Sequence, residues 1–346
     1  MLQYLYPFLT SFLLAIFLLF LFIFLFGKVR WQGRDSERHI HRSGVSRVGG
    51  LAMVLAFNAA ILLDKELVIS PELWGFMFGT IALLVVGIWD DLKELYWKIQ
   101  LFCQIAAAVF VFIAGVRIFY ITNPLTGGII NLDSGFRVVV SAMLVILWIL
   151  VVINALNWSD GIDGMAGSVT LITAATIFFL SLAPEVNQPP VAIISAILGG
   201  VALAFLVFNF YPSKVLAGTS GSMFMGFSLA VLAIFAGTKI ATAILVLIIP
   251  IIDFLWVIAQ RLRHGQSIFR PDKNHLHHKL MQLGWSQRKI TLVYTAITAL
   301  MAALALNTRA VGKGVTLLLV AIASVAVFVF INKKTTLEKS EKPTNL

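Results

Sequence analysis

The chain has 346 residues, of which 60% are hydrophobic and only 12% are charged. Soluble domains usually carry about 25% charged residues, so this composition excludes an ordinary globular protein and predicts lipid as the main solvent. The formal charge is +10. Because the basic residues flank apolar segments, they indicate membrane orientation and contact with lipid or phosphate anions, and no nucleic acid is expected as a partner.

Apolar segments of about spanning length recur along the chain and predict transmembrane helices. Lipid offers no partner to unpaired backbone groups, so the expected fold is all-α: a polytopic transmembrane helical bundle of about eleven spans. Residues 1–332 are expected to form one integral membrane domain, and residues 333–346 a disordered polar tail. The predicted spans are 4–26, 48–63, 73–89, 98–116, 137–154, 164–183, 190–208, 222–237, 240–259, 290–306 and 315–331.

The distribution of Lys and Arg predicts which side of the membrane each loop faces. With the N-terminus outside and the C-terminus in the cytoplasm, roughly 20 of the 26 Lys and Arg residues lie inside. The reverse orientation would invert this ratio. The loops that carry the candidate site residues are therefore expected on the cytoplasmic face, and the expected location is the plasma (inner) membrane. The outer loop Tyr120–Phe136 carries turn signals and could form a short hairpin.

Two adjacent carboxylates, Asp90 and Asp91, end the third predicted span, and Glu94 follows one turn later. Like charges at the edge of a low-dielectric bundle are costly unless they share a cation or hold a proton. The pair therefore indicates a divalent metal site or a general base. The alternative is a solvated charge pair at a helix end, with Glu94 paired to Lys93 or Lys98.

The next inner loop carries polar residues at every third position: Asn154, Asn157, Asp160 and Asp163. On a helix or tight turn this spacing places oxygen donors on one face. The loop has no Lys or Arg, and oxygen donors without nearby cations suit Mg²⁺ or Mn²⁺, with substrate phosphates completing the shell. The alternative is an Asx-rich turn that joins two spans.

A third element runs from Asn209 through Lys214 and Thr219 to Ser222 and places a lysine before a Gly/Ser/Thr-rich turn that opens a membrane helix. Backbone amides at a helix start, hydroxyls and a lysine could cradle a phosphate. The spacing is not that of a Walker A motif. An ordinary capped helix is the alternative, since Ser and Thr are common N-caps.

The loop after the ninth predicted span carries Arg263, His275, His277 and His278. A zinc site is disfavoured because no cysteine is near, the histidine spacing does not match one helical face, and the surrounding Lys and Arg repel a cation. His and Arg together offer donors to a diphosphate. A plain cytosolic loop is the alternative.

Two further residues have open roles. Arg42 lies in a basic inner loop and could hold a substrate anion or serve only as a positive-inside anchor. Asp253 lies within a predicted span, where a carboxylate is a functional candidate; pairing with a neighbouring helix is the alternative.

In this order and on one membrane face, the motifs resemble the polyprenyl-phosphate N-acetylhexosamine-1-phosphate transferase family, of the glycosyltransferase 4 type. The resemblance covers about Arg38 to Trp285 and is closer to the WecA/TagO-like branch than to MraY. It implies transfer of a sugar-1-phosphate, with N-acetylglucosamine as the expected sugar, from a UDP-sugar to undecaprenyl phosphate. UMP would be released, and the lipid product would begin a cell-envelope glycan. Whether the protein forms a homodimer is left open. The motifs are Asp-Asp-x-x-[Asp/Glu], Asn-x-x-Asn-x-x-Asp-Gly-x-Asp-Gly and Pro-Asp-x-x-His-x-His-His.

The resemblance also implies roles for these residues. Asp90 would be the base that deprotonates the lipid phosphate, and Asp91 would support the metal or that phosphate. Asn157 would help to bind Mg²⁺ (or Mn²⁺) and the diphosphate. The other expected contacts, to nucleotide, diphosphate or sugar, come from Arg42, Asn154, Asp160, Asp163, Asn209, Lys214, Arg263, His275, His277 and His278.

Thr219 departs from the family pattern, which reads Gly-Asp-x-Gly-Ser in most members and uses that aspartate as a metal ligand. A neutral hydroxyl is a poorer Mg²⁺ ligand than a carboxylate. Thr219 is therefore expected at the metal site as a weak ligand, with the metal held by other carboxylates or by substrate phosphates. One alternative function is an inactive homologue that binds UDP-sugar or lipid phosphate. Another is a transporter or channel, which would place polar residues at mid-span, whereas only Asp253 is a candidate there.

Overall fold

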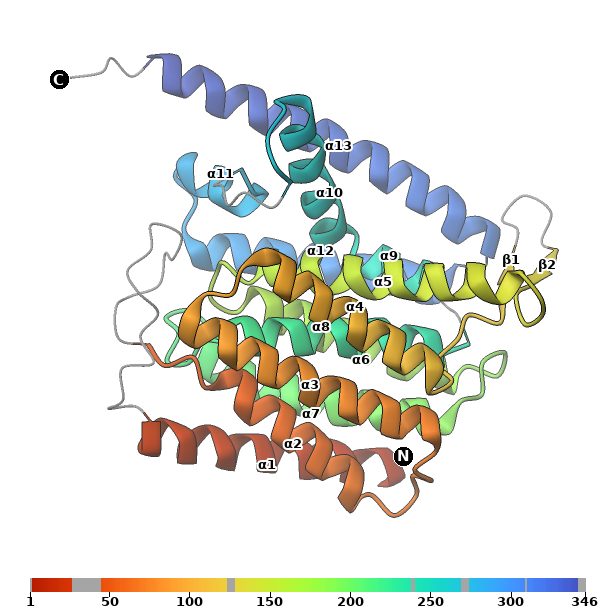
Figure 1. The fold of residues 1–346 in the computed structure, drawn as a ribbon. Helices are drawn as coiled ribbons and strands as arrows, with labels where there is room; N and C mark the ends of the chain where they lie inside the picture. The colour runs from red at the N-terminus through yellow and green to blue at the C-terminus, as the bar shows by residue number, and fades with distance from the viewer. Residues whose placement is uncertain are drawn as a thin grey trace.

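The computed structural model describes residues 2–26, 45–122, 128–237, 240–268, 274–308 and 310–341 (Figure 1). Within these ranges nearly all regular structure is helical, and the only strands form one short antiparallel hairpin. The elements are α1 (Leu2–Phe26), α2 (Gly49–Leu63), α3 (Pro71–Lys93), α4 (Trp97–Ile113), β1 (Tyr120–Thr122), β2 (Ile129–Asn131), α5 (Arg137–Ser159), α6 (Met165–Leu182), α7 (Pro189–Asn209), α8 (Gly218–Phe235), α9 (Ile240–Val246), α10 (Ile248–Arg263), α11 (Leu276–Gln282), α12 (Gln287–Asn307) and α13 (Ala310–Glu341).

Every predicted apolar segment falls on a helix, except that the ninth is divided between α9 and α10, which are bent by 80°. In the described part of the chain, eight helices are long and apolar enough to cross a membrane, or up to nine if the bent pair counts as one span. The helices α2 and α4 are apolar but shorter. The prediction of an all-α polytopic membrane protein is confirmed, and the span number and orientation stay predictions.

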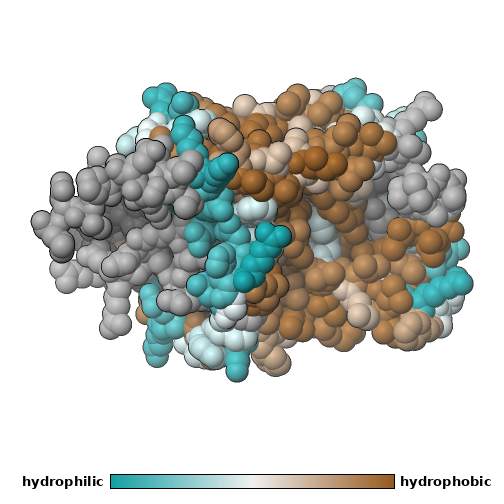
Figure 2. Space-filling view, turned by 90° about the horizontal axis from the view of Figure 1, so that it is seen from above, coloured by the Kyte–Doolittle hydropathy of each residue, from teal (hydrophilic) through white to brown (hydrophobic). Residues whose placement is uncertain are grey.

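The outer surface is apolar where a soluble protein would be polar. Figure 2 shows a broad hydrophobic region with hydrophilic residues gathered toward the ends of the molecule. On α1, the side chains of Phe17, Phe20 and Phe24 are each at least 60% exposed. Continuous exposed apolar surface of this kind is stable only against lipid or another apolar partner.

The centre of the bundle is α8, which packs against α2, α3, α5 and α6. Small residues permit close approach there, as is common between membrane helices. A Cβ atom at Gly87 of α3 would lie 2.2 Å from the Cα atom of Ser220, and one at Gly50 of α2 would lie 2.3 Å from the backbone nitrogen of Gly221. The last turn of α3 is therefore pressed against the first turn of α8.

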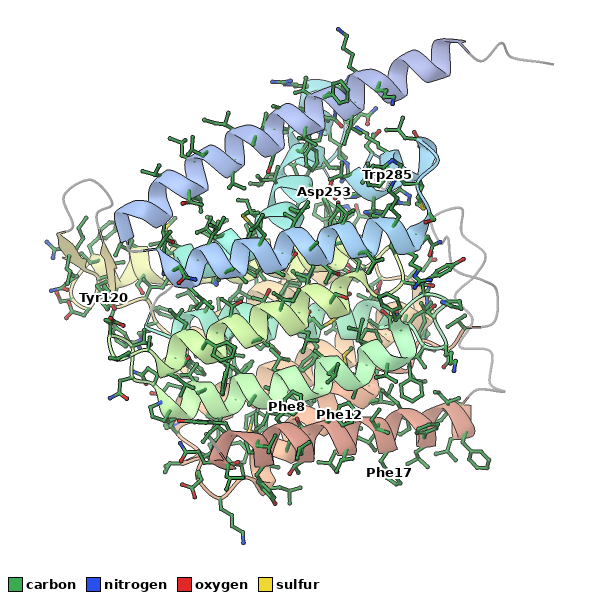
Figure 3. All side chains as sticks on the ribbon, turned by 180° about the vertical axis from the view of Figure 1, so that it is seen from behind. Phe8, Phe12, Phe17, Tyr120, Asp253 and Trp285 are labelled. Carbon is green, nitrogen blue, oxygen red and sulfur yellow. The ribbon has the colours of Figure 1, made fainter. Side chains whose placement is uncertain are left out.

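The β-hairpin and the segment around Trp285 lie at opposite ends of the bundle. Figure 3 shows Tyr120 at one end and Trp285 at the other. The Tyr120 hydroxyl, on the hairpin, donates to the Gly237 carbonyl at 3.1 Å.

The division of the chain at residue 333 stays a prediction. Helix α13 continues to Glu341, through part of the segment that was expected to be a disordered tail.

The close packing of α3 on α8 gives a first prediction. Gly87→Ala forces the two backbones apart and should lower the free energy of unfolding by about 1–3 kcal/mol. Thermal unfolding of the purified full chain in detergent would show this as a lower Tm. Gly312→Ala is the control, because its Cβ would meet only ordinary contacts at 3.5 Å or more. Equal Tm values for both variants would contradict this packing.

Candidate functional site

Asp90 is held by three donors at the end of α3. Its Oδ2 accepts a hydrogen bond from Thr219 Oγ1 at 2.6 Å, and its Oδ1 accepts from the Leu95 backbone amide at 2.8 Å. Gln100 Nε2 donates to the same Oδ1. Glu94 ends α3 in the left-handed conformation, with φ 47°, and its side chain is exposed. The carboxylate of Asp90 thus has a fixed direction toward α8.

Asp91 caps the N-terminus of α8 from a different helix. Its Oδ1 accepts from the Thr219 amide at 2.9 Å, and its Oδ2 accepts from the Ser220 amide at 3.3 Å and hydroxyl at 3.2 Å. Arg47 Nη1 lies 3.6 Å from Asp91 Oδ1. Gly218 has φ +68°, and a Cβ there would lie 2.5 Å from Asp91 Oδ2, so this position requires glycine. A carboxylate is stabilised here by the unpaired amides and by the helix dipole.

The end of α5 brings the second motif to the same turn of α8. Asn157 Oδ1 accepts from Ser222 Oγ at 2.8 Å. Asp160 follows as the C-cap of α5, and its carboxylate has no hydrogen-bond partner among the described residues. Burial and the nearby Asp91 and Asp163 carboxylates raise the pKa of Asp160 well above its ordinary value of 3.8. Among the described residues of this cluster, Asp160 is therefore the carboxylate with no protein hydrogen bond to exchange for a ligand.

Three other residues of the predicted site hold the loops together. Asp163 Oδ2 accepts from the Ser213 amide at 3.0 Å. Asn209 is buried; its Oδ1 accepts from the Gly164 amide at 2.9 Å and its Nδ2 donates to the Val215 carbonyl at 2.8 Å. Asn154 Nδ2 donates to Gln104 Oε1 at 2.7 Å and to the Leu150 carbonyl at 2.8 Å. Their proposed contacts with nucleotide or sugar stay predictions.

The histidine motif packs against the end of α10 and the second motif. His275 Nδ1 lies 3.0 Å from Asp253 Oδ2, and the Leu276 amide donates to Asp253 Oδ1 at 2.8 Å. The His275 ring also meets Trp158 edge-on, with 5.3 Å between ring centroids. Asp253 is thus paired with the start of α11, and a functional role for it stays a prediction.

His277 lies at the junction of the second and fourth motifs. It is 1% exposed, and neither of its ring nitrogens has a hydrogen-bond partner in the described part of the chain. A Cβ atom at Gly161 would lie 2.6 Å from His277 Nε2. Burial, followed by the neighbouring His278 and His275 rings, lowers the pKa of His277 well below its ordinary value of 6.5. The ring is thus neutral at neutral pH.

The structure separates the predicted basic residues into different environments. The side chains of Lys214 and Arg263 are exposed, and Arg42 lies outside the described residues. Two arginines that were not singled out lie inside instead: Arg47 beside Asp91, and Arg261, which is 4% exposed with its guanidinium 4.8 Å from the centre of the Trp158 ring. Arg261 Nη1 also donates to the Ile268 carbonyl.

The described residues contain no group of three or more His, Cys, Asp or Glu side chains arranged to hold a metal ion. The fit to Mg²⁺ rests instead on the oxygen donors and on charge. The Asp91 and Asp163 carboxylates repel Asp160, which a divalent cation would relieve. Mg²⁺ is commonly bound by one or two carboxylates plus substrate phosphates, so the donor set fits a cation that substrate completes.

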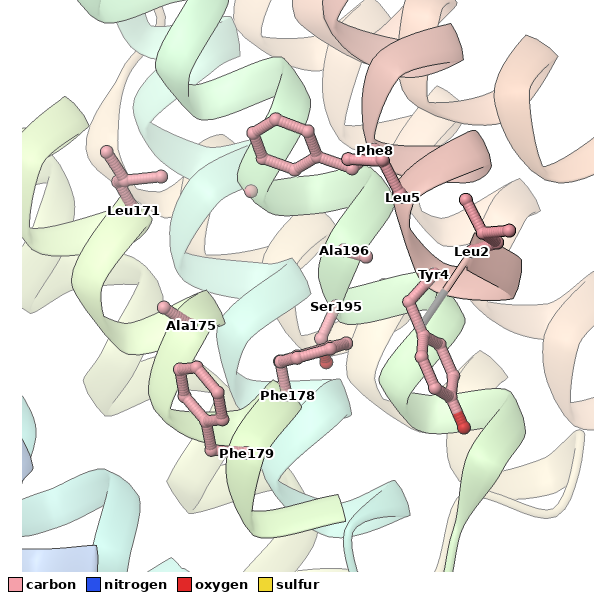
Figure 4. Close-up of a pocket in the computed structure, with 11 residues that line it drawn as sticks. Leu2, Tyr4, Leu5, Phe8, Leu171, Ala175, Phe178, Phe179, Ser195 and Ala196 are labelled. Atoms are coloured by element: carbon pink, nitrogen blue, oxygen red, sulfur yellow. The ribbon is translucent and has the colours of Figure 1, made fainter. Parts of the chain in front are cut away.

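The large cavity between α1, α6 and α7 is separate from this cluster. It has a volume of about 420 Å³ and is lined mainly by apolar side chains such as those of Phe8, Phe178 and Phe179 (Figure 4). None of the motif residues lines it. Its chemistry suits hydrocarbon rather than a phosphorylated substrate.

The described helices form a membrane bundle with an acidic cluster at one of its ends. Residues 73–237 match the model of glycosyl transferase family 4. The chain belongs to this family.

Three similar proteins align with most of this chain. The decaprenyl-phosphate N-acetylglucosaminephosphotransferase of Mycobacterium leprae is 34% identical, over 74% of this chain and 71% of the relative. The probable undecaprenyl-phosphate N-acetylglucosaminyl 1-phosphate transferase of Bacillus subtilis is 30% identical, over 77% and 74%. The phospho-N-acetylmuramoyl-pentapeptide-transferase of Bacillus pumilus is 30% identical, over 86% and 94%. The resemblance inferred from the motifs is confirmed.

The raised pKa of Asp160 gives a prediction about stability. The folded protein holds this proton to a higher pH than the unfolded chain, so ionisation destabilises the fold increasingly as the pH rises above about 3.8 toward the raised pKa. In EDTA, Asp160→Asn should therefore raise the Tm at pH 8 more than at pH 5. Asp133→Asn, at an exposed carboxylate, is the control. A Tm at pH 8 below that of the wild type would show that ionised Asp160 is not a cost to the fold.

Proposed function

We propose that this transferase moves a sugar-1-phosphate from a UDP-sugar, with UDP-N-acetylglucosamine as the expected donor, to undecaprenyl phosphate. The products are polyprenyl-diphospho-sugar and UMP, and the lipid product begins a cell-envelope glycan. The observation that carries the proposal is the convergence of Asp90, Asp91 and Asp160 around the first turn of α8. The names of the relatives support the same general reaction.

The surroundings of Asp90 suit a lipid phosphate. Trp89, Leu92 and Tyr96 flank the carboxylate pair along the chain, and each is about half exposed. An apolar surface beside a carboxylate lets a prenyl chain stay in lipid while its phosphate reaches the site. One substrate is apolar and the other dissolves in water, so the reaction requires a site at the edge of the bilayer.

Each step of the proposed reaction is assigned to particular residues of this chain. Asp90, fixed by Thr219, Leu95 and Gln100, accepts the proton of the lipid phosphate. A lipid phosphate oxygen then forms a bond to the β-phosphorus of the UDP-sugar, and the bond from that phosphorus to the bridging oxygen breaks. UMP leaves with the electron pair. Donors on the histidine side, including Arg261, stabilise the charge on the diphosphate.

A divalent cation, Mg²⁺ or Mn²⁺, belongs to this proposal. Asp91 and Asp160 would hold it, together with Asn157 and the diphosphate oxygens. When bound it neutralises the charge of two phosphorylated reactants that would otherwise repel each other. The Thr219 hydroxyl donates to Asp90 and is at most a weak ligand.

The proposed setting is the plasma (inner) membrane, crossed several times, with the site on the cytoplasmic face. The excess of Lys and Arg in the loops at the site end supports this orientation. UDP-sugars are made in the cytoplasm, so the soluble donor would reach the site from that side.

A second candidate function is an inactive protein that binds UDP-sugar or lipid phosphate without turnover. The observation in its favour is Thr219, which stands where most family members carry a metal-binding aspartate. The two candidates predict the same binding and differ in release of UMP.

The deciding assay uses purified full-length protein, undecaprenyl phosphate, a panel of UDP-N-acetylhexosamines and Mg²⁺ or Mn²⁺, with UMP release as the readout. Asp90→Ala and Asp91→Ala should each lower turnover at least about 100-fold, because one removes the proton acceptor and the other opens the start of α8. Asp133→Asn should leave it unchanged. Wild-type rates in either alanine variant would refute the assignment, and UDP-sugar binding without any UMP would favour the inactive candidate.

Thr219→Asp tests the metal ligands. The substitution removes the donor to Asp90 and adds a carboxylate beside two others, so in EDTA it should lower the Tm. Added Mg²⁺ should restore the Tm and support half-maximal turnover at a lower concentration than in the wild type. Thr219→Ser, which keeps the hydroxyl, is the matched control. An unchanged Mg²⁺ requirement would place the cation away from residue 219.

A further inference from the structure

We propose that Asp253 is a positioning residue that fixes the proton of His275 on Nδ1 and so directs Nε2 toward the diphosphate of the donor substrate. The proposal rests on the function proposed above, in which the histidine motif contacts that diphosphate. It assigns a task to a carboxylate that lies inside the bundle on α10, away from the acidic cluster. Figure 3 shows Asp253 within the molecule, toward the end marked by Trp285.

Both oxygens of Asp253 are used, and both bonds go to one short segment. Oδ2 lies 3.0 Å from His275 Nδ1, and Oδ1 accepts from the Leu276 amide at 2.8 Å. The Leu276 amide is the first of α11, so the carboxylate holds the backbone at the helix start as well as the ring before it. Asp253 is 1% exposed and His275 is 7% exposed. A buried carboxylate is costly unless it is hydrogen-bonded, and here the histidine segment supplies both bonds.

A carboxylate acceptor at Nδ1 determines the tautomer. The ring must carry a proton on Nδ1 to bond to Asp253, which leaves Nε2 as the nitrogen that can meet a ligand. Carboxylate–histidine pairs use this arrangement to fix ring orientation in metal sites and in proton-transfer sites. The same arrangement would give His275 one direction before substrate arrives.

Trp158 places this ring beside the rest of the site. Its indole meets His275 at 5.3 Å and Phe254 at 4.7 Å between ring centroids, and the Arg261 guanidinium lies 4.8 Å from its centre. Asn157 precedes it on α5 and bonds to the first turn of α8. His275 is therefore fixed from one side by a carboxylate and from the other by the residue next to the acidic cluster.

His277 provides a contrast within the same motif. Its two ring nitrogens are buried without partners, and its ring stacks on His275 at 5.6 Å with an interplanar angle of 9°. No carboxylate among the residues that the structure describes bonds to its ring. The geometry thus assigns the directed polar contact to His275 and a packing contact against Gly161 to His277.

Asp253→Asn should keep the hydrogen bond from Leu276 and reverse the direction of the one with His275. The amide oxygen of Asn can still accept from Leu276, while its NH₂ group donates to Nδ1 and requires the neutral ring to carry its proton on Nε2. We expect a loss in kcat of about 10- to 100-fold, the usual effect of removing such a histidine partner, with a Tm close to that of the wild type. Asp64→Asn is the matched control: Asp64 accepts from the Glu66 and Leu67 amides but has no histidine partner.

A double-mutant cycle distinguishes positioning from general support of the fold. If Asp253 acts only through His275, Asp253→Asn combined with His275→Gln should be no slower than His275→Gln alone. Multiplicative losses in the double variant would overturn the proposal.

The tautomer can be measured without turnover. Histidine-labelled ¹⁵N ring spectra of the full chain in detergent at pH 8 contain six histidines, and His275→Gln identifies the one in question. The wild type should show a proton on Nδ1 and Asp253→Asn a proton on Nε2. The same tautomer in both proteins would overturn the proposal. If no donor yields UMP, the proposed function fails, and the tautomer together with a UDP-sugar binding titration still decides whether Asp253 positions His275.

Discussion

The site depends on one contact, between the Asp91 carboxylate of α3 and the first amides of α8. The start of a helix leaves backbone amides without partners, and a crowded helical bundle has little water to satisfy them. Asp91 supplies the acceptor, and Gly87 and Gly218 leave the space for it. The same turn of α8 then provides the hydroxyl for Asp90 and the one for Asn157, so one capped helix end orients two motifs.

The site has two parts, an acidic cluster and a part that contains Arg261 and the histidine segment, and Trp158 lies against the second part. On one side four carboxylates of two motifs lie close enough that they repel one another, with Arg47 as a counter-ion. On the other side lie Arg261 and the histidine segment, which Asp253 holds in place. Trp158 contacts the second part and follows Asn157 of the first. This division suits the proposed reaction, in which Asp90 would accept the proton of the lipid phosphate while a cation and fixed donors would stabilise the diphosphate.

The sequence predicts the helices well because lipid imposes a strong and local requirement for apolar residues. It does not predict the bend between α9 and α10, although Pro250 in the first turn of α10 was an available signal, since proline favours helix starts. Arg261 and Arg263 cannot be distinguished by residue type. On a helix they differ by about 200° in direction, so one is buried on Trp158 and the other is exposed, and only the helix phase decides which. The Asp253–His275 pair joins residues that lie 22 positions apart across a loop, a separation with no regular period.

Thr219 changes the balance of charge in the acidic cluster. In the family pattern an aspartate stands here, and a further carboxylate beside Asp90, Asp91 and Asp160 would add repulsion that only a bound cation offsets. Thr219 Oγ1 instead donates a hydrogen bond to Asp90 Oδ2 at 2.6 Å, so the cluster is stabilised before any cation binds. The expected consequence is weaker metal binding by the free protein. In the proposed reaction, a cation that arrives with the diphosphate would complete the site only when substrate is present, and its electrostatic stabilisation would then depend on the bound reactant.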